Sequence, residues 1–246
     1  MGLFSFFKPA ASIPDLSFIG TDMHNHILPA LDDGSQNLQD SLRYIKELQQ
    51  LGYKKIICTP HIISDVHPNT PETIHTAYAL LQSKLYDENV DVELEYAAEY
   101  MVNNEFDDIL REGKVLSFGQ DKYALIEMSY LAESLNIKEA IFELMVQGYK
   151  PILAHPERYN YYHFDNHKIM EFVEVGCLLQ LNLLSLTGYY GKPAKDTALW
   201  LMKQKVISFA GTDLHHDRHL HVLKKLAADK IITRSLREIG LKNNSI

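Results

Sequence analysis

Histidines and carboxylates occur along this chain in pairs whose spacing suits metal chemistry. One residue separates His24 from His26, and one residue separates Asp213 from His215. In extended backbone, side chains two positions apart point to the same side, so each pair can approach one ion together. Imidazole and carboxylate donors without thiolate favour manganese, iron or zinc over calcium. Either pair alone is more often an incidental surface or core pair, so the interpretation needs further donors.

Such donors stand at the ends of β-rich runs. Seven short runs have strand character: Phe18–Asp22, Lys55–Thr59, Val92–Ala97, Tyr123–Glu127, Ile152–Ala154, Leu178–Asn182 and Val206–Ala210. Six of the seven are followed or ended by imidazole or carboxylate: His24 with His26, His61, Glu99, Glu127, His155, and Asp213 with His215. Glu127 ends a fully apolar run, which is a poor place to bury a charge without a cation nearby.

Helical patterns separate these runs. Apolar residues recur at intervals of three and four between residues 38 and 51, with Asn37 as the predicted cap and Gly52 as the stop. Asn136 is predicted to cap the helix before Gly148 in the same way. Strands alternating with helices are typical of parallel βαβ units. We therefore predict an α/β fold, a closed or nearly closed seven-stranded barrel, with a doubly wound open sheet as the alternative.

Parallel strands in one sheet end on one face, where α/β barrels and open sheets place their chemistry. The distant donors are thus expected to converge on a metal site. Asp32 and Asp33 precede Gly34 in what is either a turn or a source of further oxygen ligands. His219 and His221 are expected on the surface, and His67 is expected outside the site.

Arginine side chains near these strand ends could bind phosphoryl oxygens. Arg158 lies three residues after His155, and Arg218 lies three residues after His215. A planar guanidinium matches phosphate geometry, although an arginine on a solvated loop beside an acidic residue is the commoner case. Tyr159, Tyr161 and Tyr162 stand nearby and could offer aromatic rings to a substrate.

Composition limits the remaining choices. The 246 residues are 46% hydrophobic, which is enough for one large domain, expected at 17–246 after an extension at 1–16. A net charge of −8 argues against nucleic acid as a partner. Only two cysteines occur, so a reducing compartment, the cytoplasm, is expected. No apolar run is long enough to predict stable membrane insertion.

The motifs together resemble those of the polymerase and histidinol phosphatase (PHP) superfamily, and most closely the bacterial protein-tyrosine phosphatases of capsule and exopolysaccharide operons. The similarity spans residues 18 to 228. It rests on these segments in order: Thr21–His26, Leu28–Gly34, Thr59–His61, Ala98–Glu99, Ala124–Glu127, Ala154–Arg158 and Thr212–His215.

The resemblance implies a distorted seven-stranded barrel of PHP type holding three divalent metal ions, commonly Mn²⁺, with iron or zinc as alternatives. It implies three ligand sets, with Glu99 bridging two of them. The sets are His24, His26, Glu99 and Asp213; then Asp33, His61 and His215; then Glu99, Glu127 and His155.

The resemblance also implies a reaction and a partner. The reaction is metal-assisted hydrolysis of phosphotyrosine on a protein, and the implied substrate is a membrane-anchored bacterial tyrosine autokinase. Arg158 matches the arginine that follows the fifth strand in relatives, and His61 is a candidate to assist departure of the phenol. Arg218 stands closer to the final histidine than the second arginine of relatives, so its catalytic role stays open. Ile62 replaces an arginine present in some of them.

Three other functions remain open from the sequence. A small-molecule phosphomonoesterase of histidinol-phosphatase type is the nearest, although those enzymes more often have histidine where Asp33 and Glu127 stand. A metal-dependent amidohydrolase would require a bridging lysine at a strand end, and no lysine occupies the ends named above. A metal-stabilised module that binds a kinase tail without hydrolysis is the non-catalytic alternative.

Overall fold

Strands and α-helices alternate through residues 14–246, which are the residues that the computed structural model describes. Most of the expected extension at 1–16 lies outside the described residues. The strands are β1 (Thr21–Asp22), β2 (Lys55–Cys58), β3 (His61–Ile62), β4 (Glu93–Tyr96), β5 (Glu99–Met101), β6 (Tyr123–Glu127), β7 (Lys150–Ala154), β8 (Leu178–Asn182) and β9 (Ile207–Gly211).

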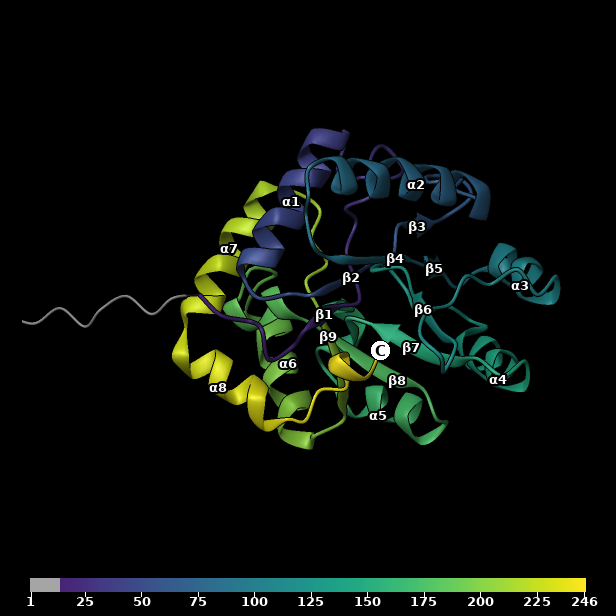
Figure 1. The fold of residues 1–246 in the computed structure, drawn as a ribbon. Coiled ribbons are helices and arrows are strands. Elements are labelled where there is room, and N and C mark those ends of the chain that lie inside the picture. Colours follow the sequence, from purple (N-terminus) through teal and green to yellow (C-terminus); the bar gives the residue numbers. More distant parts are fainter. Residues whose placement is uncertain (1–13) are drawn as a thin grey trace, which may run out of the picture.

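The helices surround the strands (Figure 1). The α-helices are α1 (Leu38–Gln50), α2 (Pro71–Asp87), α3 (Asn104–Arg111), α4 (Ile137–Val146), α5 (His167–Glu174), α6 (Lys192–Gln204), α7 (Asp217–Ala228) and α8 (Lys230–Glu238). Short 3-10 helices are η1 (Pro156–Arg158), η2 (Asn160–Tyr162), η3 (Leu183–Thr187) and η4 (Asn243–Ser245).

All strand pairs are parallel, as the alternating pattern predicts. One sheet has the order β1-β2-β4, and a larger one has the order β3-β5-β6-β7-β8-β9. Each of the seven predicted runs overlaps a strand, so the mixed α/β prediction is confirmed. The short strands β3 and β5 are additional, and they begin shortly after β2 and β4 end.

The two additional strands decide where two candidate ligands lie. His61 is the first residue of β3, Glu99 is the first residue of β5, and the two residues pair directly in register. Pro60 precedes His61 and has no amide hydrogen to continue a ladder, which favours a break in the strand at this point. The sequence predicts that His61 follows the end of a strand. Because the strand is interrupted, His61 instead begins β3 and lies beside Glu99 on β5.

The segments that follow β1 and β9 also lie side by side. The amide of Asp213 donates to the carbonyl of His24 at 2.8 Å, and the amide of His26 donates to the carbonyl of Leu214 at 3.0 Å. An isolated parallel bridge joins Asn25 to Leu214. These bonds bring the two paired motifs of the sequence into contact.

Both predicted helix starts are confirmed, but only one of them has the predicted side-chain cap. Asn37 accepts a hydrogen bond from the amide of Asp40 at 2.9 Å and begins α1, as predicted. Asn136 stands at the start of α4, but its side chain donates to Asp107 at 2.8 Å and does not cap the helix. The side-chain amide of Asn136 therefore binds Asp107 on the neighbouring α3 instead of the first turn of α4.

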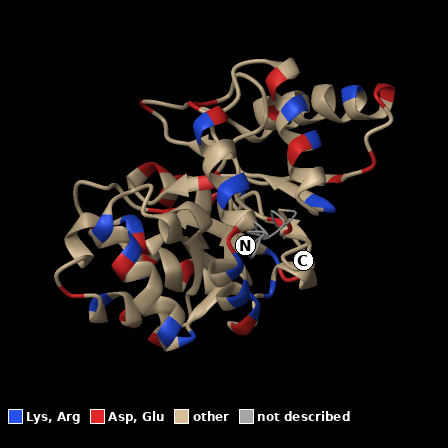
Figure 2. Cartoon of the chain, turned by 90° about the vertical axis from the view of Figure 1, so that its left-hand side faces the viewer, with Lys and Arg blue, Asp and Glu red and all other residues tan. Residues whose placement is uncertain are grey.

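Charge is mixed over the helices. Figure 2 shows Lys and Arg interspersed with Asp and Glu along them, without one continuous basic face in that view. Within residues 14–246, none of the helices has the length and apolar character needed to cross a bilayer.

Candidate metal centre

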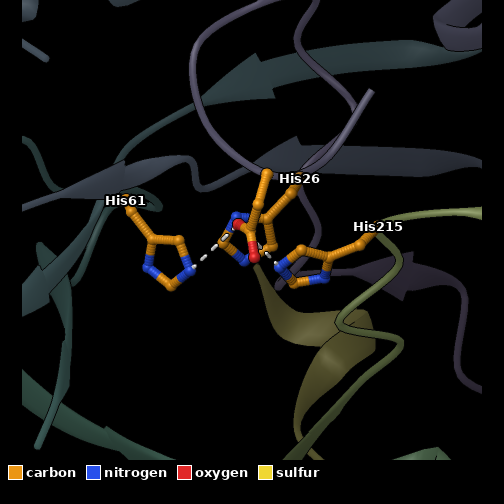
Figure 3. A group of neighbouring side chains, drawn as sticks. His26, His61 and His215 are labelled. Carbon is orange, nitrogen blue, oxygen red and sulfur yellow. Dashed lines mark ion pairs between the residues drawn. The ribbon is translucent and has the colours of Figure 1, made fainter. Parts of the chain in front are cut away.

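Nine side chains converge at the ends of the strands, and they are the nine predicted as ligands. They fall into four overlapping groups whose nitrogen and oxygen donor atoms lie within 4.8 Å of one another. The groups are His26, Asp33, His61 and His215; His24, His26 and Asp213; His24, Glu99 and His155; and His61, Glu99 and Glu127. In Figure 3 the rings of His26, His61 and His215 point toward one another from three separate segments.

Glu99 lies at the middle of the cluster. Its Oε2 atom is 3.1 Å from Nε2 of His24, 3.3 Å from Nε2 of His26 and 3.1 Å from Nδ1 of His61. Its Oε1 atom is 3.0 Å from Nε2 of His155. One fully buried carboxylate therefore contacts four imidazoles, which suits a bridging ligand.

Three histidines are oriented by oxygen atoms on the side away from the cluster. His24 Nδ1 lies 2.9 Å from Oε1 of Gln180, and His26 Nδ1 lies 2.8 Å from Oδ2 of Asp32. His215 Nδ1 lies 2.9 Å from the carbonyl of Asp213. A ligating histidine commonly donates its second ring N–H to such an acceptor. This arrangement leaves the Nε2 lone pairs facing the cluster.

The donor set fits divalent cations. Nε2 of His24 and Nε2 of His26 are 3.3 Å apart, and two lone pairs that face each other need a cation or extra protons between them. With ion–donor distances of about 2.1 Å, donors on one ion are separated by about 3.0 to 3.4 Å. The observed separations around Glu99 fall in this range.

Unpartnered buried atoms point to the same conclusion. In the described residues, four atoms of the cluster are buried without a conventional hydrogen bond: His61 Nδ1, Glu99 Oε2, Glu127 Oε1 and His155 Nδ1. Buried polar atoms normally have partners. The cluster also contains four carboxylates. When all four are ionised, two divalent ions would be enough to neutralise their negative charge.

The pKa shifts in the cluster favour ionised carboxylates next to protonated imidazoles. Burial alone would raise the pKa of Glu99, but His24 and His61 hold it well below its usual range. At His61, burial lowers the pKa of the imidazole, but the nearby carboxylates of Glu127 and Glu99 outweigh burial and raise it to about 9. The pocket thus favours positive charge at its centre.

Two candidate ligands have unusual backbone angles. His155 and Asp213 adopt positive φ angles of 35° and 49°, a region that costs a residue with a side chain about 1 kcal/mol. Such strain is found at functional sites, where surrounding contacts impose it. Gly211 lets β9 approach this region, because an added Cβ would lie 2.6 Å from Cβ of His24.

Arg158 stands at the edge of the cluster. Its Nη1 atom lies 2.5 Å from Oδ2 of Asp213, and its guanidinium carbon lies 4.0 Å from the ring centre of Tyr190 and 4.7 Å from that of Tyr130. A cavity of about 230 Å³ opens here, lined by Asp33, His61, Ile63, His67, Met101, Glu127, Tyr130, His155, Arg158, Asp213 and His215.

Several residues differ from their predicted places. His219 is buried rather than on the surface, and its Nδ1 lies 3.1 Å from the carbonyl of Asp213. His67 lines the cavity, with its ring 5.5 Å from that of His61. Tyr159 and Tyr162 are buried in the core and do not present their rings to a substrate. Arg218 is exposed in the first turn of α7.

The grouping of ligands also differs in detail from that implied by the family resemblance. His26 joins both the Asp213 group and the Asp33 group, and Glu127 lies with His61 rather than with His155. The sequence pattern did not identify Gln180, which contacts His24 and the amide of His155. Its alternation with the buried Leu179 and Leu181 could have indicated an inward-facing amide.

Comparison with known proteins identifies the chain's relatives. Residues 20–239 match the family described as "Capsular polysaccharide synthesis, CpsB/CapC". The chain belongs to the CpsB/CapC family. This CpsB/CapC member is similar to the tyrosine-protein phosphatase YwqE of Bacillus subtilis, with 30% identity over 207 residues, or 83% of this chain and 82% of YwqE.

Two further CpsB/CapC comparisons agree. The putative tyrosine-protein phosphatase CapC of Staphylococcus aureus is 24% identical over 228 residues, covering 92% of this chain and 89% of CapC. A solved chain from the crystal structures of YwqE from Bacillus subtilis and CpsB from Streptococcus pneumoniae has a TM-score of 0.76 and 28% identity. It covers 91% of this chain and 94% of its own length, and those proteins are described as unique metal-dependent tyrosine phosphatases.

Proposed function

We propose that this chain is a metal-dependent protein-tyrosine phosphatase. The observation that carries the proposal is the convergence of nine imidazole and carboxylate side chains beside one partly buried arginine. The match to the CpsB/CapC family and the names of its relatives support the same reaction.

The ligands we assign are His24, His26, Asp33, His61, Glu99, Glu127, His155, Asp213 and His215. We infer three divalent ions, with Mn²⁺ as the first choice and iron or zinc as alternatives. Bound divalent ions polarise phosphoryl oxygens and lower the pKa of water to about 7. The four overlapping donor groups support more than one ion.

The chain's own residues bind and orient the phosphate. Arg158 offers a guanidinium at the cavity wall, where it offsets charge that develops on the equatorial oxygens. Phenol has a pKa of about 10 and leaves more readily than an alkyl alcohol. His61 at the cavity wall remains a candidate to assist its departure. Arg218, exposed on α7, is a second candidate for phosphate contact.

We also infer that the two sheets form one distorted seven-stranded barrel of PHP type, the architecture of a domain spanning residues 17–246. In this interpretation β2 and β3 form one interrupted strand, and β4 and β5 form another. The bonds between the segments after β1 and β9 support closure.

The proposed substrate is the phosphotyrosine tail of a membrane-anchored bacterial tyrosine autokinase that controls capsule or exopolysaccharide synthesis. The capsular family description supports this choice. The two free, buried cysteines agree with a reducing compartment, and we place the reaction in the cytoplasm.

The test combines metal analysis with a substrate comparison. Wild-type protein loaded with Mn²⁺ should hydrolyse a phosphotyrosine peptide much faster than histidinol phosphate. His155→Ala should lose metal and activity together, whereas Arg158→Ala should retain metal and lose turnover. The exposed Arg234→Ala on α8 is the matched arginine control.

Each competing function predicts a different result. Faster hydrolysis of histidinol phosphate would assign the chain to small-molecule phosphomonoesterases. Tight binding of the phosphopeptide by metal-loaded protein without release of phosphate would assign it to non-catalytic binding modules. Unchanged turnover in Arg158→Ala would remove that residue from the mechanism.

A further inference from the structure

Two tyrosines contact the guanidinium of Arg158 from different parts of the chain. Tyr130 belongs to the segment after β6, and Tyr190 belongs to the segment between η3 and α6. The guanidinium carbon lies 4.7 Å and 4.0 Å from their ring centres. Both distances are within the range of a cation–π contact, which is strongest where water is excluded.

Hydrogen bonds involve the Tyr190 side chain and the backbone next to Tyr130. The hydroxyl of Tyr190 accepts a hydrogen bond from Asn182 at 3.3 Å, and Asn182 also donates to Oδ2 of Asp213 at 2.8 Å. The hydroxyl of Tyr161 donates to the carbonyl of Ser129 at 3.1 Å, directly before Tyr130. Tyr190 is therefore linked through Asn182 to Asp213, which is one of the candidate ligands.

The position of Arg158 leaves most of its donors available. Its side chain makes one hydrogen bond within residues 14–246, from Nη1 to Oδ2 of Asp213. A guanidinium has five N–H donors in a rigid plane, so the orientation of that plane decides where the others point. One hydrogen bond alone does not fix this orientation, because the group can rotate about it.

We propose that Tyr130 and Tyr190 are positioning residues, a tyrosine clamp that holds the plane of Arg158 so that its remaining donors face the phosphoryl group. The inference rests on the proposed function. In this proposal both rings act through Arg158, and Tyr130 also lines the cavity. The clamp acts through the aromatic faces, and the long 3.3 Å hydrogen bond at the Tyr190 hydroxyl contributes little to it.

The test is a double-mutant cycle with metal-loaded protein and a phosphotyrosine peptide. Tyr190→Leu should lower kcat/KM about 3- to 30-fold, the range of a cation–π contact, with unchanged metal content. Tyr190→Phe should stay within about twofold of wild type, because the ring is retained. Tyr130→Leu and Tyr130→Phe should show the same contrast.

Coupling to Arg158 distinguishes positioning from general structural support. In the Arg158→Ala background, Tyr190→Leu should cause no further loss, since a residue that acts through Arg158 has nothing left to position. Losses that multiply in the double variant would overturn the proposal, as would a Tyr190→Phe variant as poor as Tyr190→Leu. Tyr86→Leu, at an exposed position of α2, is the matched control and should match wild type.

A binding measurement separates failure of the clamp from failure of the proposed function. Calorimetry with inorganic phosphate should show weaker binding to Tyr190→Leu and to Arg158→Ala than to wild type. Equal phosphate affinity in all three would overturn the clamp even if wild type is an active phosphatase. Wild type without phosphatase activity would refute the function, while a clamp defect would still appear in phosphate binding. If Tyr190→Leu does not fold, Tyr130→Leu provides the same comparison.

Discussion

Gln180 should control metal affinity although it is not a proposed ligand. It is fully buried on β8, and its Oε1 atom accepts from Nδ1 of His24 at 2.9 Å and from the amide of His155 at 3.2 Å. Its Nε2 atom donates to the carbonyl of Leu181 at 2.7 Å. One amide thus orients two candidate ligands.

Gln180→Met keeps the length of the side chain and removes these hydrogen bonds. Losing an acceptor that orients a ligating histidine typically weakens metal binding about 10- to 100-fold. At about 1.4 kcal/mol per tenfold, this is a loss of about 1.4 to 2.8 kcal/mol in binding free energy. The amide of His155 also loses its partner, which should destabilise the metal-free protein by about 1 to 3 kcal/mol.

The assay is competition for Mn²⁺ between the protein and a chelator of known affinity. Thermal unfolding of the metal-free protein measures the stability effect separately. Gln82→Met, on the exposed face of α2, is the matched control and should change neither quantity. If Gln180→Met binds Mn²⁺ as tightly as wild type while folding normally, then the orientation of His24 does not limit affinity and the reasoning fails.

Two further predictions concern buried carboxylates. Glu99→Gln should lower the number of Mn²⁺ ions per chain in elemental analysis more than Glu127→Gln does, because Glu99 contacts four imidazoles; equal losses would contradict a bridging role. Burial raises the pKa of Glu157 from 4.5 to about 7, against hydrogen bonds from Ser185 and Asn182. Folding therefore favours the neutral form of Glu157. Its contribution to the free energy of unfolding is fully present below pH 4.5 and is lost as pH rises through 7, where the buried side chain ionises. Glu157→Gln should therefore gain in unfolding free energy relative to wild type between pH 5 and 8, by roughly 3 kcal/mol at most; parallel pH profiles would refute this.

The strand ends could be predicted from the sequence because parallel topology is a strong constraint. His24, Glu127 and Asp213 follow or end apolar runs, and parallel pairing brings such positions to one face whatever their separation along the chain. The convergence of the nine side chains agrees with that expectation. It needed no knowledge of individual side-chain contacts.

Contacts between loops could not be predicted in the same way. His219 looks like one of several surface histidines in a polar run, yet it is buried against the Asp213 carbonyl. Tyr130 and Tyr190 lie far apart along the chain and carry no spacing signal. Their contact with Arg158 depends on how the segments after β6 and η3 fold over the cluster, which periodicity does not describe.

The cavity wall is the reason we assign the proposed phosphate recognition mainly to Arg158. Among the described residues that line the cavity, Arg158 is the sole arginine or lysine. Ile62, at the position of an arginine expected in some relatives, is buried on β3, and Arg218 is exposed on α7. A cavity wall with one guanidinium is more sensitive to the orientation of that group than a wall with several. This concentration of charge on Arg158 is the physical reason for expecting the tyrosine clamp to matter in this chain.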